Sequence, residues 1–331
     1  MDLTVIIAVV VVALVFDYIN GFHDAANAIA TSVTTKALTP RVALVMAAVL
    51  NFVGALLGER VARTVTETIS PGAGSAGLLV VVAGLLGAIG WNLLTWWWGL
   101  PSSSTHALIG GLVGAAVAAG VTAHWDVVLR DVVLPMVVSP VVAFGAALLL
   151  MLLVQRLFAR VSPTRVYSGF RLAQTLSAAG VALGHGLQDA QKTMGVIFLA
   201  LVSGGYVTDG DPLPLWVVLS AATALAAGTY VGGWRVIRTL GQRLIDLDPP
   251  RGFVAESVAS GVLYTAAYAA QAPISTTHTV TSAVGGAGAA GGLRHIRWRV
   301  ARRIGLAWLF TFPGAALLAV LAHLVLRLLP V

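Results

Sequence analysis

The chain has 331 residues, of which 58% are hydrophobic and only 10% are charged, and its mean hydropathy is +0.91. Soluble globular proteins carry about 25% charged residues, so this composition excludes an ordinary water-soluble enzyme, a nucleic-acid-binding protein and a disordered chain. The net charge is +7, and the basic residues fall in loops between apolar runs, a pattern typical of multi-pass membrane proteins. The lack of cysteine excludes disulfides, thiolate metal sites and iron–sulfur clusters.

Ten apolar runs account for most of the chain, and a helix needs about 20 such residues to cross the hydrocarbon layer. The first run lacks the basic start and the cleavage pattern of a secretion signal, so we interpret it as a retained membrane segment. Polar motifs interrupt the first and the sixth run. In chain order the runs are Leu3–Leu38, Val42–Gly58, Gly77–Trp98, Ser102–Val121, Val127–Val154, Leu172–Val202, Leu215–Trp234, Phe253–Ala270, Ile274–Gly291 and Ile304–Leu329.

The distribution of Lys and Arg predicts the orientation of the chain. If the N-terminus is outside and each run crosses once, 15 Lys and Arg residues fall in loops inside and 4 fall in loops outside. Because basic residues gather on the cytoplasmic side, this asymmetry predicts a multi-pass protein of the cell (inner) membrane with both termini outside.

Two polar motifs recur at a separation close to half the chain. The sequence NGFHDAAN at 20–27 is followed by HGLQDAQK at 185–192, an offset of 165, and PSSSTH at 101–106 is followed by PISTTH at 273–278, an offset of 172. Each half holds five runs, an odd number, so the second half enters the membrane from the opposite face, as in the inverted repeats of secondary transporters.

We therefore predict an all-α polytopic membrane protein with two inverted-topology repeats and interrupted helices. The first repeat covers residues 1–155, a basic cytoplasmic loop covers 156–171, and the second repeat covers 172–331. The two Pro-Ser/Thr motifs lie either in surface loops or at the tips of re-entrant hairpins. We favour hairpins, which carry the hydroxyls to depth, where irregular backbone is tolerated only beside a cavity.

Each repeated motif places an Asp inside an apolar run, Asp24 in the first half and Asp189 in the second, while Asp17 and Glu256 sit nearer segment ends and are given little functional weight. An ionisable group at the bilayer centre costs roughly 2.5–3.5 kcal/mol, so it normally faces a partner or an aqueous pathway. We predict that these carboxylates, with Asn20, Gln188 and the adjacent His23, bind or neutralise a coupling cation. The alternatives are that they only join helices through hydrogen bonds and that His23 only packs.

The Pro-Ser/Thr motifs are rich in hydrogen-bond donors and suit the start of a helix. Such a start carries roughly half a positive charge and free N–H groups, which favour a tetrahedral oxyanion such as phosphate. The alternative is a pair of capped helices without a ligand, and Lys192 either contacts the anion or pairs with Asp189. The predicted anion-binding residues are Ser103, Ser104, Thr105, Ser275, Thr276, Thr277, Asn27 and Lys192.

A carboxylate beside an oxyanion repels it unless the carboxylate is neutralised. The anion would therefore bind well only when the cation is present, which is itself a coupling mechanism. The residues do not choose between a proton, sodium and a metal–phosphate complex, and no residue is assigned to a bound metal.

The motifs resemble those of the inorganic phosphate transporter (PiT) family over essentially the whole chain. NGFHDAANAIAT at 20–31 and GHGLQDAQKTMG at 184–195 resemble its paired signatures, and PSSSTH and PISTTH resemble its hydroxyl-rich motifs. The resemblance implies symport of inorganic phosphate by alternating access. The His before Asp24 resembles the bacterial low-affinity branch, associated with proton or metal–phosphate coupling, whereas the sodium-driven branch usually has Asn there. Gln188 replaces the Asn common before the second Asp, so the coupling ion stays open.

A phosphate symporter is thus the favoured function, with a proton or metal–phosphate preferred over sodium. Sodium-coupled phosphate or sulfate transport and an anion channel are the alternatives, the channel being disfavoured by the repeat. An intramembrane hydrolase is disfavoured because Ser104 and His106 do not face each other on a helix. We expect no enzymatic activity, no cofactor besides the coupling cation and no nucleic-acid partner; the surroundings are a lipid bilayer, and a homo-oligomer is left open.

Overall fold

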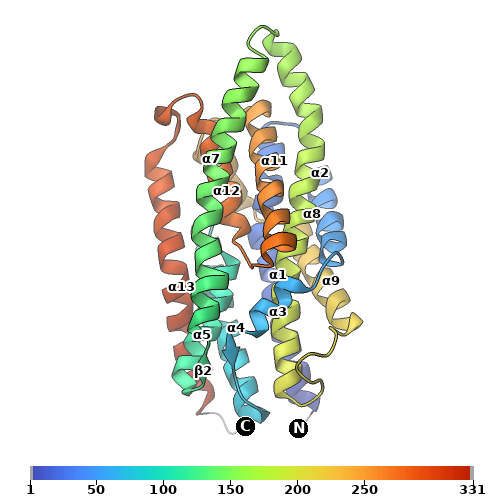
Figure 1. Cartoon of the computed structure of the whole chain (residues 1–331), viewed down its shortest axis with the longest axis vertical. Coiled ribbons are helices and arrows are strands. Elements are labelled where there is room, and N and C mark those ends of the chain that lie inside the picture. Colours follow the sequence, from blue (N-terminus) through green and yellow to red (C-terminus); the bar gives the residue numbers. More distant parts are fainter. Residues whose placement is uncertain (1–2, 329–331) are drawn as a thin grey trace.

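The computed structural model describes residues 3–328, and most of them belong to helices that run roughly along one axis (Figure 1). Leu329, the predicted end of the tenth run, lies outside the described residues. The elements are α1 (Leu3–Thr34), α2 (Pro40–Ala55), α3 (Arg60–Thr66), β1 (Ile69–Ser70), α4 (Gly74–Trp98), α5 (Ser104–Ala119), β2 (Thr122–Ala123), α6 (Trp125–Val127), the π-helical turn η1 (Val128–Val133), α7 (Leu134–Leu157), α8 (Pro163–Ser203), α9 (Leu215–Val231), α10 (Trp234–Arg238), η2 (Thr239–Arg243), α11 (Pro249–Thr265), η3 (Ala266–Ala270), α12 (Thr276–Ala289), η4 (Leu293–His295) and α13 (Trp298–Leu326).

Several of these helices are built to cross a membrane. Within residues 3–328, α1, α4, α13 and the stretch from α6 to α7 are each long and apolar enough to span it alone. Two bent pairs add two more spans, because α2 meets α3 at 73° and α9 meets α10 and η2 at 58°. Large apolar side chains such as Val141 and Leu149 of α7 are exposed on the outside of the bundle. The chain is therefore a multi-pass membrane protein, as its composition predicts.

The polar motifs of the first and sixth runs lie within continuous helices, since α1 and α8 pass through both motifs without a break. The interrupted helices of the predicted fold are the two bent pairs, α2 with α3 and α9 with α10 and η2, near the end of the second run of each half. The predicted loop 156–171 is shorter in the structure, where it covers residues 158–162, since Pro163 suits the first turn of α8, a helix of 41 residues.

The Pro-Ser/Thr motifs lead into two short helices that approach each other from opposite ends of the molecule. The 16 residues of α5 and the 14 of α12 reach only about 20–24 Å, less than the roughly 30 Å of the hydrocarbon core. In Figure 1, α5 lies in the lower half and α12 in the upper half. The β1–β2 bridge ties the start of α4 to the end of α5 at one end. The expected hairpins that carry the hydroxyls to depth are thus present.

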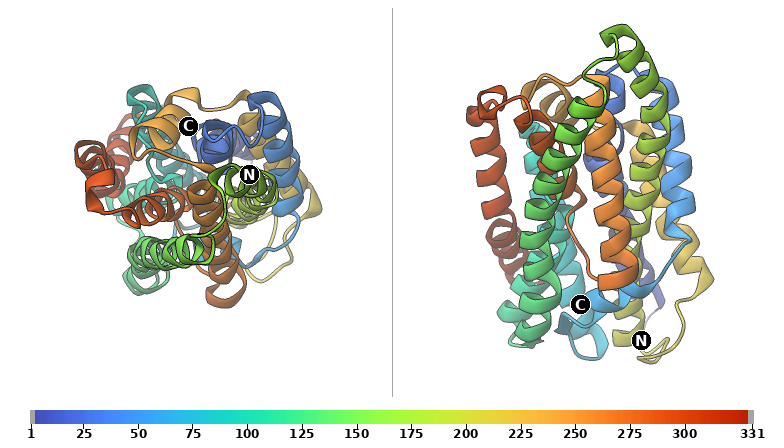
Figure 2. Two further views of the ribbon diagram at one scale, coloured as in Figure 1. Left: turned by 90° about the horizontal axis from the view of Figure 1, so that it is seen from above. Right: turned by 45° about the horizontal axis from the view of Figure 1, so that its top comes forward.

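The helices of the two halves pack crosswise: α1 lies on α9, α2 on α8, α5 on α13 and α12 on α7. Glycines allow the backbones to touch in two of these contacts. A Cβ at Gly21 or Gly228, between α1 and α9, or at Gly54 or Gly186, between α2 and α8, would come within 2.0–2.4 Å of a backbone oxygen on the facing helix. Seen from above (Figure 2, left), α1 and α8 lie side by side with helices of both halves around them.

Candidate functional site

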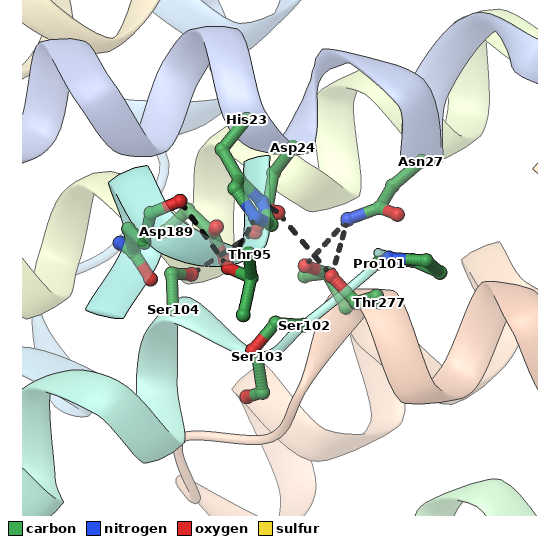
Figure 3. A network of polar contacts seen from close by, with 12 residues as sticks. His23, Asp24, Asn27, Thr95, Pro101, Ser102, Ser103, Ser104, Asp189 and Thr277 are labelled. Atoms are coloured by element: carbon green, nitrogen blue, oxygen red, sulfur yellow. Dashed lines mark hydrogen bonds and ion pairs between the residues drawn. The ribbon is translucent and has the colours of Figure 1, made fainter. Parts of the chain in front are cut away.

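The two predicted carboxylates meet inside the helix bundle. Asp24 of α1 and Asp189 of α8 are fully buried, and one oxygen of each lies within 4.8 Å of the other and of a ring nitrogen of His185. Figure 3 shows both Asp side chains beside the start of α5. The repeat therefore brings one carboxylate from each half to a single place, although the two are 165 residues apart in the sequence.

Asp24 is held from three helices. Its Oδ1 lies 2.7 Å from Nδ1 of the neighbouring His23 and accepts from Thr277 Oγ1 at 3.3 Å, and its Oδ2 accepts from Ser104 Oγ at 3.0 Å. The other ring nitrogen of His23 lies 3.1 Å from Thr95 Oγ1 of α4. His23 therefore reaches the carboxylate although adjacent helical residues usually diverge, and it links Asp24 to α4 (Figure 3).

Asp189 forms a buried ion pair with Lys192, whose Nζ lies 3.0 Å from its Oδ1, and its Oδ2 lies 3.2 Å from His185 Nε2. The same ammonium donates to Ser104 Oγ at 3.1 Å and to Thr105 Oγ1 at 2.9 Å. Lys192 thus joins the carboxylate of the second half to the hydroxyls of the first. In this structure the ion pair and the contact with the proposed anion site exist together.

The two hydroxyl-rich motifs form matching helix starts. Ser103 accepts a hydrogen bond from the backbone N–H of His106, and Ser275 accepts one from that of His278, each at 3.1 Å. These two serines are N-caps, the role that the ligand-free alternative assigned to the motifs. The His106 and His278 rings lie 4.7 Å apart, and Ser104 points instead to Asp24 and Lys192.

The remaining hydroxyls join α1 to α12 and one motif to the other. Asn27 donates through Nδ2 to Thr277 Oγ1 at 2.9 Å and to Thr276 Oγ1 at 3.3 Å. Thr105 Oγ1 donates to the backbone oxygen of Ile274 at 3.2 Å, so the two helix starts touch. Of the predicted anion-binding residues, Ser104, Thr277 and Lys192 thus contact the carboxylates directly. The N–H ends of α5 and α12 supply partial positive charge there.

The charges at this centre do not balance by themselves. Asp24 and Asp189 face one ammonium, that of Lys192. At an effective dielectric of about 20, two unit charges about 5 Å apart interact by roughly 3 kcal/mol. An oxyanion beside both carboxylates would therefore be repelled unless a proton or a metal ion neutralised one of them.

The donor set also bears on a metal ion. Within residues 3–328, Asp24, His185 and Asp189 are the one group of acidic and imidazole ligands close enough to share an ion. Two carboxylates and an imidazole suit a divalent metal ion, which is how the metal of a metal–phosphate substrate would be held.

Two of the predicted cation-site residues, Asn20 and Gln188, lie on the same helices as the carboxylates. Gln188 donates to the backbone oxygens of Leu263 at 3.3 Å and Ala272 at 3.5 Å, where it supports the segment before α12. Neither amide is brought to Asp24 or Asp189 by a hydrogen bond.

Sequence reasoning missed three residues that position the carboxylates. His185 precedes Asp189 by one helical turn, a spacing that places both on one face and could have indicated the contact. His185 is itself oriented by Asn51 of α2, whose Oδ1 lies 3.2 Å from its Nδ1. No local sequence pattern marks Asn51 or Thr95, because each contacts the centre from a part of the chain that is distant in sequence.

Glu256 is a further buried carboxylate, to which sequence reasoning gave little weight. Located on α11, it accepts hydrogen bonds from Thr31 of α1 and from Gln174 and Ser177 of α8. No Lys, Arg or His of residues 3–328 forms an ion pair with it. Glu256 therefore ties α1, α8 and α11 together. Its contact with α1 lies beyond Asp24, toward the C-terminal end of that helix.

We expect Glu256→Ala to lower the free energy of unfolding by about 3 kcal/mol or more. Three buried donors would lose their acceptor, and each unsatisfied donor costs about 1–3 kcal/mol. Glu256→Gln, which keeps an acceptor oxygen, should lose less. Thermal unfolding of the purified protein in detergent measures the effect, with exposed Glu67→Ala as the control; equal midpoints for both alanine variants would contradict the structural role.

Comparison with known proteins agrees with the geometry. The profile of the phosphate transporter family matches residues 20–319. A Mycobacterium tuberculosis protein named "Probable low-affinity inorganic phosphate transporter" is 47% identical over 98% of this chain and 78% of its own length. Proteins of that name from Bacillus subtilis and Rhizobium meliloti are 40% and 45% identical, covering 99% and 96% of this chain and 100% and 95% of their own lengths.

A solved structure shares the fold. It is titled "The sodium-dependent phosphate transporter", is 24% identical and superposes with a TM-score of 0.86, covering 99% of this chain and 100% of that one. At this identity the likeness concerns the fold alone. The family profile and the relatives together show that this chain belongs to the phosphate transporter family.

Proposed function

We propose that the protein moves inorganic phosphate across the membrane in symport with a cation. The observation that carries the proposal is the meeting of Asp24 and Asp189, one from each half, at the touching starts of α5 and α12. Membership of the phosphate transporter family and the names of the relatives support phosphate as the substrate. We favour a proton or a metal–phosphate complex over sodium, with Asp24, Asp189 and His23 taking part in cation binding.

The hydrogen bonds suggest how binding of the two ions would be coupled. Ser104 and Thr277 now donate to Asp24, and Lys192 is paired with Asp189. A cation or proton that neutralises Asp24 would weaken its hold on these hydroxyls, which could then turn to an oxyanion. The carboxylate and the anion would thus compete for the same hydroxyl donors, and binding of the cation to the carboxylate would favour the anion.

The orientation of the protein is part of the proposal. The start of α1 and the end of α13 lie at one end of the molecule, and the turn of residues 158–162 lies at the other (Figure 1). We propose that the end carrying the 158–162 turn and most of the basic loops faces the cytoplasm. Labelling of single cysteines introduced at exposed positions of either end, in intact cells, tests this assignment.

Uptake of labelled phosphate into proteoliposomes tests the transport function. An inward pH gradient or sodium gradient should drive accumulation above the level in protein-free liposomes, and the rate should saturate with phosphate. Excess sulfate should compete only if the anion site accepts it. Separate gradients decide between proton and sodium coupling, and added Mg²⁺ tests a metal–phosphate substrate. Uptake that ignores every gradient would refute symport and favour a channel.

A further inference from the structure

Each half of the chain holds the hydroxyl motif of the other half through one threonine. Thr239 of η2 donates through Oγ1 to the backbone oxygen of Gly99 at 2.7 Å. Thr64 of α3 donates in the same way to that of Gln271 at 3.0 Å. Gly99 and Gln271 both have a left-handed backbone, at φ 64° and 54°, and each stands two residues before the proline of its motif. The two contacts are therefore equivalent in the repeat.

The two contacts lie toward opposite ends of the molecule. The segment α3 follows α2, which returns toward the end that carries both termini, whereas α10 and η2 follow α9, which runs the other way. We call these ends the terminal end and the turn end, after the turn of residues 158–162 (Figure 1). A movement of either bent segment therefore reaches a hydroxyl motif from one end only.

An arginine fastens the contact at the turn end. The guanidinium of Arg235 lies over the rings of Trp96 and Trp97, at 5.0 and 4.5 Å from their centres. It also donates to the backbone oxygen of Trp97 at 2.8 Å. A cation over an indole face is attracted to it, so α10 is held against the last turn of α4, just before Gly99.

The equivalent residues at the terminal end stand apart. The offset of the two threonines, 175 residues, makes Arg60 the counterpart of Arg235. The offset of their acceptors, 172 residues, makes Tyr268 the counterpart of Trp96. Both counterparts line a cavity of about 600 Å³ beside α3, α8 and η3. Within residues 3–328, Arg60 has no hydrogen bond, ion pair or ring contact, so this end is open where the other is closed.

We propose that these two sets of residues are latches that close in turn during transport. The Arg235 latch consists of Arg235, Trp96 and Trp97, and the Arg60 latch consists of Arg60 and Tyr268. This structure has the first latch closed and the second open. In the opposite state, α3 moves inward, Arg60 covers the Tyr268 ring and the cavity shuts, while Arg235 leaves its tryptophans.

The open end is also connected to the Asp24–Asp189 centre. Gln191, which lines the cavity, accepts a hydrogen bond from the backbone N–H of Val61 on α3 at 2.8 Å. Lys192, the next residue of α8, contacts Asp189 and two hydroxyls of α5. The inference rests on the proposed symport, and it names the residues that keep the two ends from opening together.

Distances between spin labels in the purified protein test the latches without transport. The chain has no cysteine of its own, so introduced pairs are labelled cleanly. Leu93→Cys with Gln242→Cys reports on the turn end, and the repeat counterpart, Thr265→Cys with Glu67→Cys, reports on the terminal end; all four positions are exposed. With both arginines present, the turn-end pair should show mainly its short distance and the terminal-end pair mainly its long one.

Arg235→Gln should raise the ratio of long to short distances at the turn end about tenfold, and the terminal-end distance should shorten. Arg238→Gln, an exposed arginine of the same short helix, is the matched control and should change neither distance. Adding Arg60→Gln to Arg235→Gln should return both distributions toward those of the wild type, because the competing latch is lost as well. A merely structural effect of Arg235 would not be reversed in this way.

Two results overturn the inference: unchanged distances in Arg235→Gln, or no reversal in the double variant. If Arg235→Gln does not fold, Trp97→Leu, which removes one aromatic partner of the same latch, takes its place. Failure of the symport proposal is distinct, because the distances are measured without substrate or gradient. In that case the distances would still respond to the variants, while phosphate uptake by the wild type followed no gradient.

Discussion

Asp24→Asn and Asp189→Asn are each expected to abolish gradient-driven accumulation of phosphate in proteoliposomes. The two carboxylates lie within 4.8 Å of each other, so they repel each other and an approaching oxyanion by roughly 3 kcal/mol each, or about 100-fold in affinity. In the proposed symport, cation binding would remove this repulsion in the wild type. An amide has no charge to cancel, so the cation should no longer control phosphate binding.

The measurement is labelled phosphate uptake with and without the driving gradient. The coupled component should fall at least about 100-fold in both variants, while phosphate exchange at equal concentrations falls less. Asp209→Asn, in the exposed turn after α8, is the matched control and should behave like the wild type. Full coupling in either site variant would show that its carboxylate does not carry the coupling charge.

Lys192→Met should be the most disruptive single change at the centre. It leaves Asp189 buried with only the contact to His185, and removing one partner of a buried ion pair costs about 3–5 kcal/mol. Ser104 and Thr105 lose the ammonium as well. We expect a markedly lower unfolding temperature in detergent and no phosphate uptake.

A double variant separates stability from transport. Asp189→Asn together with Lys192→Met removes both charges, so most of the lost stability should return while uptake stays absent. Lys36→Met, in the exposed turn after α1, controls for the loss of a lysine. A double variant as unstable as Lys192→Met, or one that still transports, would contradict the role assigned to the pair.

The sequence allowed the centre to be predicted because the repeat carries long-range information. Two motifs at one offset indicate that Asp24 and Asp189 occupy equivalent positions in oppositely inserted halves, and such positions meet near a common axis. The hydroxyl motifs were predictable for the same reason. The repeat does not give helix register, so the contacts of His185 with Asn51 and of His23 with Thr95 could not be foreseen.

The partners of the motif around Asp24 could not be predicted from local polarity. The helix α1 passes through the motif without a break, and His23, Ser104 and Thr277 satisfy the carboxylate through their side chains. The structural role of Glu256 was also underestimated. It sits away from the duplicated motifs, and only the packed structure shows its three hydrogen-bond donors.

The crosswise packing of α1 on α9 and of α2 on α8 means that neither half of the chain has a complete core. While the ribosome is still making the second half, the glycine grooves at Gly21 and Gly54 have nothing to dock against except lipid. Maturation must therefore finish late, after α8 and α9 have inserted.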